Sequence, residues 1–128
     1  MFAEACRERG VPLEILIPFD EQEFLAVSVE PSGAGWRERF LHLVASAGVS
    51  VSSAGEAVDD PRRSNAFERT NERMLERSMT WGADRLRFVA LWDGRGGDGA
   101  GGTAAMVEAV RRRTNSIHVI ETQALTTR

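Results

Sequence analysis

The stretch "LRFVALWDGRGGDGAGGTAAMVEAVRRRTNSIHVI", residues 86–120, decides the fold class. It opens with the nearly continuous apolar run 86–92, which is typical of a parallel strand covered on both faces by helices. A glycine-rich loop follows, then an amphipathic run over 103–113 that predicts a helix, and then an apolar run over 117–120 that predicts the next strand. Strand, loop, helix and strand in this order make a right-handed βαβ unit.

The rest of the chain continues this alternation of helices and strands. Residues 2–9 predict a helix ended by Gly10, and 13–19 predict a buried strand stopped by Pro18. Helical segments are expected at 20–29 and 35–48, the second with Trp36, Phe40 and Leu43 on one face. Residues 48–63 favour a loop with at most a short strand. A longer helix is expected at 64–82, with Ser64 as its N-cap and an inner side marked by Phe67, Met74, Leu75 and Trp81.

Length and composition bound the class of protein. A chain of 128 residues is long enough for one core, so we expect a single α/β domain over 1–128, a three-layer Rossmann-like sandwich with a mostly parallel sheet. The net charge of −3 argues against a nucleic-acid or acidic-membrane partner. No apolar run approaches the roughly 20 residues of a membrane span. The charge balance favours a small-molecule partner, and the lone Cys6, which cannot form an internal disulfide, favours a cytoplasmic protein.

The glycine-rich loop matches two nucleotide-binding patterns only in part. Gly94, Gly96 and Gly99 fit G-x-G-x-x-G, but such a match is common in a stretch of this composition. A phosphate-loop pattern also runs from Gly96 to Thr103, with a glycine where the lysine belongs. Because the chain contains no lysine, this pattern argues against ATP hydrolysis of the Walker type. What remains is a helix N-terminus after "GAGGT", residues 99–103, which can bind an anion.

Several polar residues near this loop are candidates for ligand contact. Asp93 and Asp98 would repel phosphate but can accept hydrogen bonds from ribose hydroxyls or a base N–H. Alternatively, Asp93 ends the strand and Asp98 caps the helix in a flexible connection. Thr103 is expected to cap the helix or touch the ligand. Asn71 falls on the buried side of its helix and is expected either to line the pocket or to clamp a backbone group.

Other charged residues carry less information. Arginines and glutamates alternate along the 64–82 helix in a pattern typical of a solvated face. His42 and His118 are far apart in sequence, with no second ligand at metal-binding spacing. The sequence therefore gives no metal site, no cofactor and no catalytic residue set.

"ALWDG" (90–94) followed by "GDGAGGTAAMVEAV" (97–110) resembles the closing strand, loop and helix of the SLOG superfamily. That superfamily groups Lonely Guy and lysine-decarboxylase-like nucleotide hydrolases with DNA-processing-protein-A-like and sensor domains, and nucleoside 2-deoxyribosyltransferases have a similar loop. "LEILIPF", "FLAVSV", "GWRERF" and "NERMLERS" also resemble SLOG-like domains of bacterial signalling and conflict proteins. The family begins with a strand and a glycine turn, so we expect this chain to start after them, as the C-terminal portion of a larger domain.

The resemblance implies a module that binds a nucleotide or nucleotide-derived signal. Its expected pocket consists of one aspartate pair, three glycines, a threonine and an asparagine: Asp93, Gly94, Asp98, Gly101, Gly102, Thr103 and Asn71. The family's hydrolases and transferases carry a glutamate three residues after the loop threonine, and this chain has Met106 there. A thioether cannot act as nucleophile or general base, so we expect binding without turnover.

Two alternatives stay open at this point. The first is an enzyme that cleaves or transfers at a nucleoside N-glycosidic bond, with Asp98 or Asp93 in place of the glutamate. The second is a structural or oligomerising domain, because a missing first strand would leave a sheet edge that pairs with another copy.

Overall fold

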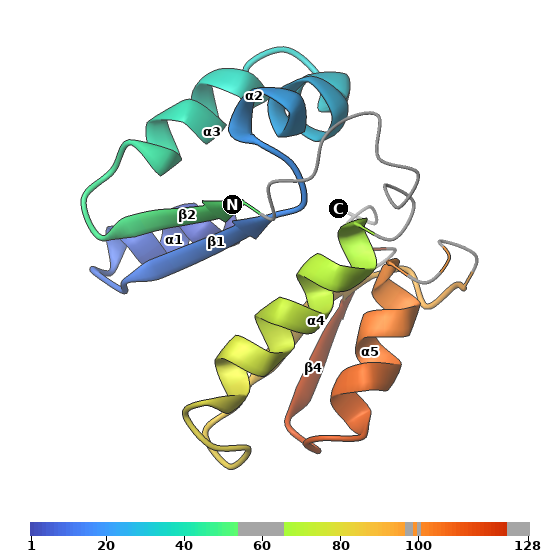
Figure 1. Cartoon of the computed structure of the whole chain (residues 1–128). Coiled ribbons are helices and arrows are strands. Elements are labelled where there is room, and N and C mark those ends of the chain that lie inside the picture. Colours follow the sequence, from blue (N-terminus) through green and yellow to red (C-terminus); the bar gives the residue numbers. More distant parts are fainter. Residues whose placement is uncertain (54–65, 97–98, 100, 123–128) are drawn as a thin grey trace. The chain divides into compact units, whose positions relative to one another are not determined.

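The computed structural model describes residues 1–53, 66–96, 99 and 101–122. The chain divides into two compact units, Met1–Ala66 and Phe67–Arg128, here called unit 1 and unit 2 (Figure 1). Within the described residues, each unit contains one parallel pair of strands, β1–β2 in unit 1 and β3–β4 in unit 2. The chain is therefore of the mixed α/β class, as predicted. Over the described residues these are two separate two-stranded sheets, and the three-layer sandwich stays a prediction.

Unit 1 contains two strands and a series of short helices. In chain order these are α1 (Phe2–Glu8), β1 (Leu13–Ile17), α2 (Glu21–Phe24), the π-helical η1 (Leu25–Val29), the 3₁₀ turn η2 (Glu30–Ser32), α3 (Trp36–Val44) and β2 (Val49–Ser53). β1 and β2 pair in parallel, with Leu13 opposite Val49. The expected short strand within 48–63 is thus confirmed at its start, and residues 54–63 lie outside the described part.

Local sequence explains where these elements begin and end. Gly10 adopts a φ of +68° after α1, as expected for a glycine beyond a last helical turn. The Asp20 carboxylate accepts a hydrogen bond of 3.0 Å from the Glu23 N–H and so caps α2. Ile17 at the end of β1 and Phe19 just after it are both fully buried.

Unit 2 is the βαβ unit preceded by one long helix. α4 (Ala66–Met79) begins at the boundary between the units, and β3 (Phe88–Trp92), α5 (Thr103–Arg111) and β4 (Ile117–Glu121) follow. β3 and β4 pair in parallel, with Phe88 opposite Ile117. Leu75 of α4 packs with Met106 and Val110 of α5 in one buried cluster against these strands. The strand, loop, helix and strand predicted from the opening stretch are confirmed.

One expectation about burial in unit 2 is wrong, and another stays a prediction. On β3 the alternate side chains Val89 and Leu91 are 43% and 51% exposed, so within the described residues no helix covers this face of the strand. On α4, Leu75 is buried, but Phe67, Met74 and Trp81 are 40%, 38% and 73% exposed. At 100° per residue, Phe67 and Met74 lie about 80–100° around the helix from Leu75. Trp81 comes after the end of α4. Ser64, the expected N-cap, lies outside the described residues.

In the described part of the chain, no helix has the length and apolar character that crossing a membrane requires.

Candidate functional site

The candidate site is the loop that joins β3 to α5 in unit 2. It leaves the carboxyl end of a parallel strand and enters the N-terminus of a helix, which is the usual position of ligand sites in open α/β sheets. Of the expected pocket residues, the structure describes Asp93 and Gly94 at the start of this loop and Gly101, Gly102 and Thr103 at its end. Asp98 lies outside the described residues.

The first part of the loop is a turn held by side-chain hydrogen bonds. Asp93 Oδ1 accepts a hydrogen bond of 2.9 Å from the Arg95 N–H, and the Trp92 indole Nε1 donates to the Arg95 carbonyl at 2.8 Å. Gly94 allows this turn because it adopts a φ of +79°. Asp93 thus has the strand-ending role proposed as one of its two alternatives. The other carboxylate oxygen of Asp93 makes no hydrogen bond to any described residue.

The last part of the loop lies directly against α4. The Asn71 amide Nδ2 donates a hydrogen bond of 3.0 Å to the Gly101 carbonyl. A Cβ atom at Gly101 would lie only 2.8 Å from Phe67 Cβ and 2.9 Å from the Glu68 backbone nitrogen. Asn71 therefore clamps a backbone group, which is one of the two roles expected for it. Its contact with a ligand stays a prediction.

The start of α5 offers backbone donors. Gly102 is the N-cap residue, in an extended conformation, and no side chain caps the helix. The alternative in which Thr103 caps the helix is therefore wrong, because Thr103 is already the first helical residue. Met106 donates the first helical hydrogen bond, to the Gly102 carbonyl at 3.1 Å. Among the described residues, the N–H groups of Thr103, Ala104 and Ala105 have no acceptor.

These donors define what the site can do chemically. Three N–H groups at a helix start, together with the positive end of the helix dipole, favour an anionic oxygen. Gly101 and Gly102 bring no side chain that could occupy the same space. The arrangement is suited to a phosphate or carboxylate group placed at the start of α5.

The position that carries a glutamate in the resembling enzymes does not face this loop. Met106 is 7% exposed and belongs to the apolar cluster of unit 2. Glu108 is exposed and forms an ion pair of 2.7 Å with Arg111 on the outer side of α5. Among the described residues, α5 therefore has no carboxylate at the position where those enzymes carry their glutamate.

No group of three or more potential metal ligands occurs among the described residues. His42, in unit 1, accepts a hydrogen bond of 2.9 Å from the Arg7 guanidinium, which joins α3 to α1.

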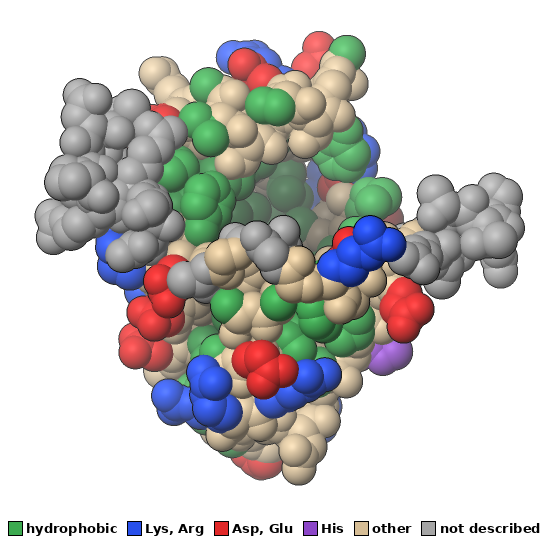
Figure 2. All heavy atoms as spheres, turned by 90° about the vertical axis from the view of Figure 1, so that its right-hand side faces the viewer, with side chains coloured by type: hydrophobic (Ala, Val, Ile, Leu, Met, Phe, Trp, Pro, Cys, Tyr) green, Lys and Arg blue, Asp and Glu red, His purple; other side chains and the backbone are tan. Residues whose placement is uncertain are grey.

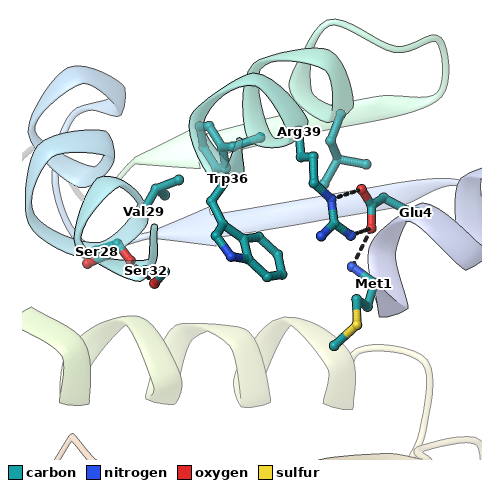
Figure 3. A pocket seen from close by; sticks show the side chains of 9 residues that line it. Met1, Glu4, Ser28, Val29, Ser32, Trp36 and Arg39 are labelled. Atoms are coloured by element: carbon teal, nitrogen blue, oxygen red, sulfur yellow. Dashed lines mark hydrogen bonds and ion pairs between the residues drawn. The ribbon is translucent and has the colours of Figure 1, made fainter. Parts of the chain in front are cut away.

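Unit 1 contains a pocket of about 170 Å³ that the sequence did not indicate (Figure 3). Its lining comes from α1, η1, η2 and α3 and is mainly apolar, with Val29, Trp36, Phe40 and Leu43. The expected apolar face of α3 thus lines a pocket, and Trp36 is 36% exposed. A volume of this order admits a single aromatic ring. The helical spacing of Trp36, Phe40 and Leu43 was the only feature of the sequence that pointed to this pocket. The same spacing is equally typical of a helix face packed in a core.

A polar network closes one side of this pocket. The Arg39 guanidinium lies 4.2 Å from the centre of the Trp36 ring and donates two hydrogen bonds to the Glu4 carboxylate, at 2.9 and 2.5 Å (Figure 3). The Met1 amino group also contacts Glu4, at 2.5 Å. The hydrogen bond from Arg39, followed by that from the amino group, lowers the pKa of Glu4 to about 2. Two positive groups share the single Glu4 carboxylate, so this side of the pocket keeps a net positive charge.

No protein-family model, no curated protein and no solved structure matches this chain.

Proposed function

We propose that the chain is a nucleotide-binding module of the SLOG type that binds its ligand without turning it over. The observation that carries this proposal is the set of three N–H groups at the start of α5 that have no acceptor among the described residues. In this proposal a phosphate or comparable anion of the ligand accepts hydrogen bonds from Thr103, Ala104 and Ala105. The three-layer Rossmann-like sandwich and a cytoplasmic location belong to the same proposal.

The other end of the ligand would meet Asp93. The Arg95 N–H fixes one carboxylate oxygen, so the second can accept a hydrogen bond from a ribose hydroxyl or a base N–H without losing the turn. The Arg95 side chain is exposed in the same loop and can offset the repulsion between Asp93 and a phosphate. This combination of anion donors and a preset acceptor favours a nucleotide over a simple inorganic anion.

The absence of a catalytic carboxylate at position 106 favours binding over cleavage. A glutamate introduced there would lie in the apolar cluster with Leu75 and Val110 rather than in the loop. An N-glycosidic hydrolase or transferase therefore remains the second candidate function, and in it Asp93 or Asp98 would have to take the role of the missing glutamate.

The test uses a proline that removes a single donor. Proline is well tolerated at the first helical position, and Gly102 before it already has the extended conformation that a following proline requires. Thr103→Pro removes one N–H group together with the hydroxyl, and Thr103→Ala removes the hydroxyl alone. A lost charge-assisted hydrogen bond costs about 1.5–3 kcal/mol, or roughly 10- to 150-fold in affinity.

The assay is a proton NMR time course with nucleosides, mononucleotides, NAD and cyclic nucleotides, which follows the anomeric protons. Line broadening without new anomeric signals identifies a ligand that is bound and left intact. We expect Thr103→Pro to weaken that broadening strongly for the phosphorylated ligands and Thr103→Ala to keep most of it. If both variants bind the ligands equally well, the anion of the ligand does not bind at the start of α5. Release of free base would show that the protein is an enzyme that cleaves the N-glycosidic bond.

A further inference from the structure

A groove lies between α4 and α5 of unit 2. It has a volume of about 390 Å³. α4 and α5 lie side by side along it (Figure 1). The residues that line it are Glu72, Leu75, Glu76, Met79, Ala109, Arg112 and Arg113. None of them belongs to the glycine-rich loop, so this surface is separate from the proposed nucleotide site.

The two walls of the groove carry opposite charges. Glu72 and Glu76 come from α4, and Arg112 and Arg113 follow the last turn of α5. All four are exposed, and none forms an ion pair with a described residue. On the face of the molecule that Figure 2 shows, acidic side chains gather along one edge with arginine side chains beside them. The groove therefore presents an acidic strip next to a basic strip, each without a partner.

The floor between the strips is apolar. Leu75, Met79 and Ala109 form it.

We propose that this groove is the interface of a homodimer, in which a second copy of the chain docks through the same surface. α4 and α5 each run opposite to the strands that follow them, so the two helices are parallel to each other (Figure 1). A two-fold axis along the helices places the partner's α4 over α5 at the same height. The partner's acidic strip then meets the basic strip, and the reverse contact forms by symmetry.

Only this orientation satisfies the charges. A two-fold axis across the helices would place α4 over α4 and α5 over α5, so that like charges would meet. Complementary charges fix the orientation of a complex and exclude others. The groove carries both strips itself, and a second copy therefore supplies the matching pattern without a further protein. This contact differs from pairing through an open sheet edge, because it uses helices only.

Charge reversal followed by mixing tests this interface. One variant carries Glu72→Arg and Glu76→Arg, and the other carries Arg112→Glu and Arg113→Glu. Alone, each would bring like charges together in both halves of the dimer. Mixed in equal amounts, they form a heterodimer in which every pair is again opposite. Arg85→Glu is the control, because Arg85 is exposed, lies outside both helices and does not line the groove.

The measurement is sedimentation velocity of the full chain as a function of concentration, at low and at high salt. We expect a dimer for the wild type and the control, an association at least about tenfold weaker for each reversed variant, and recovery in the mixture. A single chain with all four substitutions should dimerise like the wild type. That variant restores the charge pattern across the groove and shows whether loss of fold explains the separate variants.

Three results would overturn the proposal. The first is a wild type that is monomeric at every concentration. The second is a wild-type dimer that both reversed variants retain, since another surface, such as a sheet edge, would then hold it. The third is that the mixture of the two reversed variants and the chain with all four substitutions both stay monomeric, although circular dichroism shows that these proteins are folded.

Discussion

Replacement of Gly101 by alanine tests the contact between the glycine-rich loop and α4. The added Cβ would lie 2.8 Å from Phe67 Cβ and 2.9 Å from the Glu68 nitrogen. Carbon atoms in contact prefer about 3.5–4.0 Å, so the loop or α4 must move by most of an ångström. The Glu68 nitrogen is backbone and cannot rotate away. Overpacking of this kind costs about 1–3 kcal/mol.

Gly96→Ala is the matched control for this substitution. Gly96 lies in the same loop, no heavy atom lies within 4 Å of its added Cβ, and neither glycine has a φ in the left-handed region. Each substitution gains about 0.4–1 kcal/mol from the lower entropy of the unfolded chain, and this gain cancels between the two variants. The difference in the free energy of unfolding between them therefore isolates the overpacking.

The assay is urea denaturation of the two variants, followed by circular dichroism. We expect Gly101→Ala to be less stable than Gly96→Ala by about 1–3 kcal/mol. The Asn71 hydrogen bond to the Gly101 carbonyl should be lost with it, because the same movement separates the two groups. If the two variants unfold at the same urea concentration with the same slope, the loop does not lie against α4 and the description of the site fails.

Three further predictions concern other contacts. Asn71→Ala leaves the Gly101 carbonyl without its donor and should lower the free energy of unfolding by about 1 kcal/mol; an unchanged urea midpoint would contradict this. Asp93→Asn keeps an oxygen for the Arg95 N–H and should unfold like the wild type, whereas Asp93→Ala should be less stable; equal stability of both variants would show that the turn needs no acceptor. The pKa of Glu4 is lowered from 4.5 to about 2, so its contribution to stability is complete above about pH 4.5 and is lost as the pH falls toward 2. In the Arg39→Met variant, an NMR titration should show the pKa of Glu4 closer to 4.5. This variant should be less stable than the wild type at neutral pH but not below pH 2. If the pKa of Glu4 is the same in the variant and the wild type, the pairing with Arg39 is refuted.

The order of helices and strands was predictable because it depends on local sequence. Pro18, the glycines after α1 and α4, and the apolar spacing of α5 all act over a few residues, and each element they predict is present. The π-helical turn over Leu25–Val29 was not predicted, because the same apolar residues suit an ordinary helix. The burial of α4 side chains was predicted poorly. Phe67 and Met74 are as apolar as Leu75, and only the packing of α5 against one stripe of the helix distinguishes them.

The candidate site was predictable as a position rather than as a set of contacts. A glycine-rich loop between a strand and a helix indicates a ligand site from sequence alone. Sequence did not show that Gly101 is needed for contact with α4, because that contact joins residues 30 or more apart along the chain. It also left two roles open for Asn71, since an amide on a helix serves a ligand or a backbone group equally well.

The bare start of α5 has a consequence for amide hydrogen exchange. Thr103, Ala104 and Ala105 are partly buried, yet their N–H groups have no acceptor among the described residues, so burial alone cannot slow their exchange with deuterium. In the free protein these three amides should exchange quickly beside a well-protected helix core at Val107 and Val110. An anion bound there would slow their exchange selectively, and the location of a ligand could be read from three amides before its identity is known.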